Sequence, residues 1–84
     1  MPENKIFYVF ELQTYGDGTG SAIPSTYPTL REAESKFYQI LSFAALSTVY
    51  RHGAVLMTEE GFTMKQEVFT HQMEPEQQND QEEA

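Results

Sequence analysis

The sequence contains no cysteine, and this absence excludes several kinds of chemistry at once. A chain without thiols can form no disulfide framework, no thiolate metal site and no cysteine nucleophile. A structure that needs no disulfides fits a reducing compartment.

Basic residues are scarce as well, because five lysines and arginines stand against thirteen acids, for a net charge of −8. Residues 1–72 carry eight of the acids and all five bases, whereas residues 73–84 carry five acids and no base. So few cations would bind a phosphate backbone weakly. We therefore expect no direct contact with nucleic acid, and an acidic mimic of DNA would depend on residues 73–84.

Long apolar runs are also missing. The start, MPENK, lacks the basic and apolar regions of a signal peptide. No stretch approaches the roughly 20 apolar residues of a membrane span. We expect a protein of the cytoplasm with no membrane contact.

A chain of 84 residues forms one domain at most. A domain of this size has a small margin of stability, so we expect the protein to form oligomers.

Aromatic and β-branched residues fill residues 5–14, KIFYVFELQT, and predict a strand with apolar side chains on both faces. Such a strand is central in its sheet, or its second face meets a partner subunit. Glycines and an aspartate in residues 15–20 predict a hairpin loop. Pro24 in the return segment, residues 21–27, places that strand at an edge.

A helix is predicted from Thr29, which forms a capping box with Glu32. Apolar residues recur from there at helical spacing and form a stripe that should lie on the sheet. The stripe comprises Leu30, Ala33, Phe37, Ile40, Leu41, Ala44 and Thr48.

The later part of this helix is expected to be apolar nearly all round, which one sheet cannot cover. We therefore predict an interface there, where Phe43→Glu or Leu46→Glu would disrupt assembly because a buried unpaired charge is costly. The predicted interface comprises Tyr38, Phe43, Leu46, Val49 and Tyr50.

Residues 54–58 and 62–71 predict two further strands around the turn Glu59-Glu60-Gly61. In the last strand, Phe62, Met64 and Val68 are expected to be buried. The fold class is therefore α+β, with a four-stranded antiparallel sheet in the order ββαββ and one long helix on one face. Residues 1–72 form this single domain, and residues 73–84 are expected to be a disordered acidic tail.

No motif for catalysis or metal binding is present. His52, in a loop after the helix, and His71, at a strand end, have no further ligands at metal-binding spacing. Serines and threonines lie in no nucleophile motif, so no catalytic residue, metal or other cofactor is predicted, and the protein is not expected to be an enzyme. Arg31, Arg51 and His52 are candidate contacts for a small anionic ligand, although solvated charge beside the helix end explains Arg51 as well.

Four short segments within residues 5–71 form a recognisable pattern, namely Ala33–Lys36, Ala44–Ser47, Leu56–Gly61 and Glu67–His71. In these segments the sequence resembles a family of small phage and prophage proteins of Gram-positive bacteria. The resemblance implies a phage origin and assigns no chemistry to any residue.

Two functions are compatible with these observations. The first is a non-enzymatic, oligomeric phage protein that antagonises a host defence factor, by binding a host or phage protein or by sequestering a small signalling molecule. The second is a structural or assembly accessory of the virion, which should then co-purify with phage particles.

Overall fold

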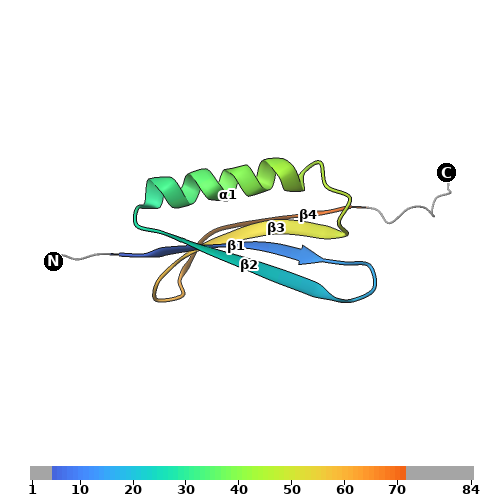
Figure 1. The fold of residues 1–84 in the computed structure, drawn as a ribbon, viewed down its shortest axis with the longest axis horizontal. Helices are drawn as coiled ribbons and strands as arrows, with labels where there is room; N and C mark the ends of the chain where they lie inside the picture. The colour runs from blue at the N-terminus through green and yellow to red at the C-terminus, as the bar shows by residue number, and fades with distance from the viewer. Residues whose placement is uncertain (1–4, 72–84) are drawn as a thin grey trace.

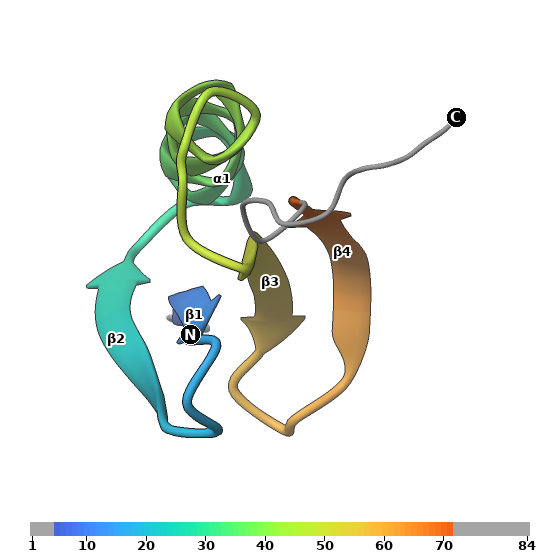
Figure 2. The same ribbon diagram turned by 90° about the vertical axis from the view of Figure 1, so that its right-hand side faces the viewer.

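The computed structural model describes residues 5–71, which form four strands and one helix. The elements follow the predicted order, with β1 (Phe7–Thr14), β2 (Gly20–Tyr27), α1 (Leu30–Ala44), β3 (Arg51–Thr58) and β4 (Thr63–Thr70). Figures 1 and 2 show that α1 lies along one side of the sheet. The predicted disordered tail, residues 73–84, lies outside the described residues.

The sheet has the order β2-β1-β3-β4, and all its neighbouring strands are antiparallel. β1 is central, as the apolar character of both its faces predicts, and β2 is an edge strand in which Pro24 pairs with Phe10. An edge position tolerates proline because one side of the strand needs no backbone donors. The sheet topology therefore confirms the predicted placement of both strands.

Both hairpins turn through glycines with positive φ, 93° at Gly18 and 92° at Gly61. In the first turn, Asp17 Oδ1 accepts a hydrogen bond from the backbone N–H of Thr19 at 3.0 Å. Glycine adopts this left-handed conformation without the steric cost of a Cβ. The two hairpins lie where the sequence predicts them.

The core forms between α1 and the two central strands. Thr29 caps the helix by accepting a hydrogen bond from the N–H of Glu32 at 3.2 Å. The helical stripe then packs on the sheet as predicted, up to Ala44. The buried cluster comprises Val9, Ala33, Phe37, Ile40, Ala54 and Leu56.

The helix ends earlier than the sequence pattern suggests, at Ala44. Short i to i−3 hydrogen bonds tighten the chain there, from Leu46 N–H to Phe43 O and from Ser47 N–H to Ala44 O. The Ser47 hydroxyl then accepts from Val49 N–H at 2.9 Å, which gives the backbone an alternative to the helix. The prediction that the apolar helical pattern continues through Val49 is therefore wrong.

The predicted buried face of β4 is also wrong. Thr63 pairs with Met57 and Lys65 pairs with Leu56, so Met64 is an extra residue in the strand, a β-bulge. Val68 pairs with Gly53 on the side opposite α1, and Met64 and Val68 remain 41% and 46% exposed. Lys65, Glu67 and Phe69 instead lie on the helix side, where they pair with Leu56, Ala54 and His52.

Candidate functional site

The side of the sheet opposite α1 is apolar and has no helix or strand of residues 5–71 packed on it (Figures 1 and 2). We call this side the open face. Side chains alternate between the faces of a strand, and paired residues share a face, so the register defines its members. Its large apolar side chains are Tyr8, Phe10, Leu12, Val55, Met57 and Val68. None of them is buried.

Charged side chains of the sheet lie mostly on the other side. The four strands carry the lysine, arginine and acidic residues Glu11, Arg51, Lys65 and Glu67. The register places Glu11, Lys65 and Glu67 on the helix side, and only Arg51 on the open face. An antiparallel sheet with one solvated face normally has its polar residues on that face. The open face has the composition of a surface that another layer covers.

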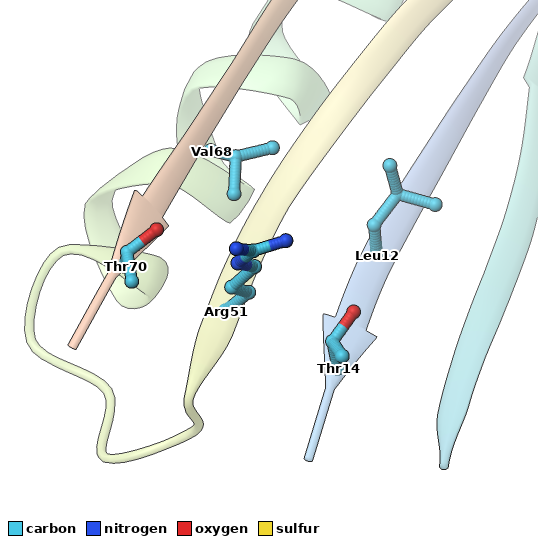
Figure 3. Close-up of a pocket in the computed structure, with 5 residues that line it drawn as sticks. All are labelled: Leu12, Thr14, Arg51, Val68 and Thr70. Atoms are coloured by element: carbon cyan, nitrogen blue, oxygen red, sulfur yellow. The ribbon is translucent and has the colours of Figure 1, made fainter. Parts of the chain in front are cut away.

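A hollow of about 350 Å³ lies at one end of the open face. Figure 3 shows its lining, in which Arg51 lies between Thr70 of β4 and Thr14 of β1, while Val68 and Leu12 lie further along the same two strands. The register places Gly53 between Leu12 and Val68, and glycine leaves the space between them empty. Thr14 and Thr70 complete the wall with hydroxyl groups. The hollow can accept an apolar group beside an anionic one.

Gly53 is required there for a second reason. A Cβ at this position would overlap the carbonyl oxygen of Glu67 and would lie 2.6 Å from the Cα of Val68. Because both are backbone atoms, no change of side-chain rotamer could relieve the overlap. The close approach of β4 to β3 therefore depends on glycine.

A polar cluster lies on the helix side, on β1 and β3 and in the hairpin after β1. Glu11 Oε2 accepts hydrogen bonds from His52 Nε2 at 2.7 Å and from Gln13 Nε2 at 3.2 Å. The Tyr15 hydroxyl donates to Gln13 Oε1 at 2.5 Å. Since an ionised carboxylate only accepts, His52 Nε2 carries a proton. The remaining 3.4 Å contact between His52 Nε2 and Gln13 Nε2 then joins two donors and is no hydrogen bond.

This arrangement leaves the His52 ring unsuited to contact a substrate. Nε2 is occupied by Glu11, and Nδ1 is buried without a hydrogen-bond partner in the described structure. A general base must reach the proton that it removes. The structure also corrects the placement of His52, which is a buried strand residue and not part of a loop.

The Glu11 carboxylate is expected to make stability depend on pH. The hydrogen bond from His52 holds the pKa of Glu11 below its ordinary value of 4.5, against the opposing effect of burial. A lowered pKa in the folded state stabilises the protein above pH 4.5, and this contribution is lost as the pH falls through the folded value. Glu11→Gln should therefore be less stable than the wild type at neutral pH, with a difference that shrinks in acid.

Urea unfolding of both chains between neutral pH and about pH 3 measures this difference. Glu67→Gln, on the same side of the sheet, is the control for the loss of one charge. If the free energies of unfolding of the wild type and Glu11→Gln differ by the same amount at every pH, Glu11 does not have a lowered pKa in the folded state.

The sequence predicts His71 as a surface residue at a strand end, whereas in the structure its side chain is hydrogen-bonded to the helix. Its Nε2 lies 2.8 Å from the carbonyl oxygen of Ala44, and its backbone N–H donates to Tyr50 O at 2.7 Å. The ring therefore donates to the Ala44 carbonyl at the end of α1, which also accepts from Ser47 N–H. In the described structure, His71 connects the end of β4 to the end of α1.

The structure does not bring the predicted interface residues onto one surface. Tyr38 and Phe43 are five positions apart on α1, so they point about 140° apart around it. Tyr38 lies toward β4, where Lys65 Nζ is 5.6 Å from its ring centroid. Leu46, which is 86% exposed, lies in the connection that follows the helix. Val49 and Tyr50, in the same connection, are half-buried.

The candidate anion contacts are also separated. Arg31 lies in the first turn of α1, while Arg51 and His52 begin β3, beyond the other end of the helix. Neighbouring residues on a strand point to opposite faces, so Arg51 lies on the open face and His52 on the helix side. The Arg51 guanidinium lies 5.3 Å from the centroid of the Tyr50 ring. Of the three, only Arg51 borders a hollow.

Among residues 5–71, no three histidine, aspartate or glutamate side chains gather as a metal ion would require. Within the same range, no helix could span a lipid bilayer. Comparisons with protein-family models, with curated proteins and with solved structures found no match to this chain.

The alternation of Tyr8, Phe10 and Leu12 against Phe7 and Val9 already indicates a strand with two apolar faces. Sequence reasoning missed that β3 and β4 extend this apolar surface, because that depends on the strand order and on the register of the paired strands. Sequence reasoning also missed that Gly53 lies at the bottom of a hollow. The signal available was a lone glycine inside a strand, which often marks a close approach of another backbone.

Proposed function

We propose that this chain is a non-enzymatic protein-binding domain that acts through the open face of its sheet. The observation that carries the proposal is the distribution of side chains, apolar on the open face and charged on the helix side. Burying apolar surface drives association, at roughly 25 cal/mol per Å². Large exposed apolar patches on a folded domain usually mark a binding surface.

The resemblance to small phage proteins supports a narrower form of this proposal. In that form, the chain is made in the cytoplasm of a bacterial host and binds a factor whose activity it blocks. The binding surface is then the open face, and not the later part of the helix as the sequence predicts. No ring nitrogen of the buried His52 is available for catalysis, which is consistent with action by binding alone.

Photo-crosslinking tests the binding surface. Phe10, on the open face, is replaced by p-benzoylphenylalanine in the full chain, and cells that naturally express the gene are illuminated. The same replacement at Phe43, an exposed phenylalanine near the end of α1, is the matched control. We expect a protein adduct of defined mass from position 10 and little from position 43. No adduct from position 10, or adducts from position 43 alone, would refute the proposal.

A further inference from the structure

We infer that the open face binds the open face of a second copy of this chain, with the strands of the two copies running antiparallel. This inference rests on the proposed function and names the occupant of the binding surface. It follows from three properties of the face, namely its size, its distribution of charge and its shape.

The face is large enough for a stable contact. Four strands of eight residues, with strands about 4.8 Å apart and residues about 3.3 Å apart, cover roughly 500 Å² in projection. Side chains that stand up from a sheet have more accessible surface than their projection. A standard interface takes about 800 Å² of accessible surface from each partner. Two such faces packed together form a sandwich with a shared core.

The charges are self-complementary in one orientation. Arg51 begins β3, and Glu59 and Glu60 follow its other end. Val55 lies midway, four positions from both Arg51 and Glu59. A two-fold axis through Val55, perpendicular to the strands, therefore places Arg51 of each copy opposite the acidic turn of the other. An axis parallel to the strands would instead bring the two arginines toward each other.

The shape agrees with the same axis. The axis through Val55 places Gly53 opposite Met57 of the second copy, because each lies two positions from it. Gly53 lies under the hollow of about 350 Å³, and Met57 pairs with Tyr8 at the bulky end of the face. Methionine is flexible and fills irregular spaces well. Each copy would therefore fill the hollow of the other, as a self-complementary interface requires.

Crosslinking at the proposed axis tests this arrangement. The chain has no cysteine, so Val55→Cys introduces a single thiol. A short bismaleimide, with a reach close to the ~10 Å between packed sheets, should join two Val55→Cys chains into a covalent dimer. Phe43→Cys, away from the sheet, should give no covalent dimer under the same treatment. Equal yields from the two variants would overturn the inference.

Sedimentation of the full chain measures the contact itself. We expect a dimer, and Val55→Asp should raise its Kd about 100-fold or more, since two unpaired charges would meet at the axis. Phe43→Asp is the control, and circular dichroism confirms that both variants are folded. A wild type that stays monomeric at every concentration, or a Val55→Asp chain that dimerises like the wild type, would overturn the inference.

Charge reversal tests the orientation. Arg51→Glu should raise the Kd of the dimer about tenfold, and adding Glu59→Arg to the same chain should restore it. Arg51→Gln should also weaken the dimer, because it removes the pairing with the acidic turn. Tighter dimerisation of Arg51→Gln would show that two arginines meet, as the parallel axis places them, and would overturn the antiparallel arrangement. These outcomes are independent of the photo-crosslinking at Phe10. An adduct there with a different protein, together with a monomeric chain, would refute the second copy and leave the proposed function standing.

Discussion

Gly53→Ala is expected to lower the free energy of unfolding by about 3 kcal/mol or more, the upper end of the range for overpacked sites. The added Cβ would overlap the carbonyl oxygen of Glu67, and the whole of β4 would have to move to make room. A loss of this size is a large part of the stability of so small a domain. Urea unfolding, followed by circular dichroism, gives the value.

Gly18→Ala is the matched control for this change. Gly18 has a φ of 93°, but no atom lies within 4 Å of a Cβ built there. Its substitution should therefore cost only the strain of the left-handed backbone, about 1–2 kcal/mol. If Gly53→Ala proves no more destabilising than Gly18→Ala, the close approach of β4 to β3 is not as described. Together, the two substitutions separate the energetic cost of backbone strain from the cost of steric overlap.

Phe37→Ala is expected to destabilise the protein by about 3–5 kcal/mol. Phe37 is 3% exposed and packs in the cluster formed with Val9, Ala54 and Leu56. Its removal would leave a cavity between α1 and the sheet, and a two-layer domain has no second core to compensate. Thermal or urea unfolding would show the loss as a much lower midpoint.

The neighbouring Tyr38 provides the comparison. Tyr38 is 52% exposed and meets Phe37 edge to face, with the ring centroids 5.2 Å apart. Tyr38→Ala should therefore cost about 1 kcal/mol, mainly the loss of this aromatic contact. Similar costs at positions 37 and 38 would mean that the helix is rotated about its axis relative to the packing described.

The two substitutions also separate stability from the proposed binding. Phe37 lies under α1, whereas Phe10 and Val55 lie on the open face. Loss of dimerisation in Val55→Asp would be an effect of the interface if its unfolding midpoint equals that of the wild type at a concentration low enough for the wild type to be monomeric. Loss of both in Phe37→Ala would be an effect of the core.

Much of the fold could be predicted from the sequence, because the decisive signals are local. The capping box at Thr29, the glycines of the hairpins and the proline of β2 each act through their own backbone or through neighbours a few residues away. The helical stripe up to Ala44 is local in the same sense, since one helix face must lie on the sheet. These signals were sufficient for the order ββαββ and for the single α+β domain.

Two features could be found only from the tertiary structure, namely where α1 ends and which face of β4 meets the helix. Residues 45–49 continue an apolar pattern, yet hydrogen bonds at Ser47 and the contact of His71 with Ala44 compete with further helical turns. The second contact joins residues 27 positions apart, which no local pattern can show. The face of β4 that meets α1 depends on the pairing of β4 with β3, which places Lys65 and Glu67 on the helix side.

The sequence by itself determined which segments form strands and helix, that β1 has two apolar faces and that the chain has no thiol chemistry. Only the tertiary structure decided which strands lie side by side, and with them the continuous apolar surface from Tyr8 to Val68. It also decided that Arg51 lies beside the hollow above Gly53, while His52 is buried against Glu11. The physical reason is that pairing between distant strands sets which side chains share a face.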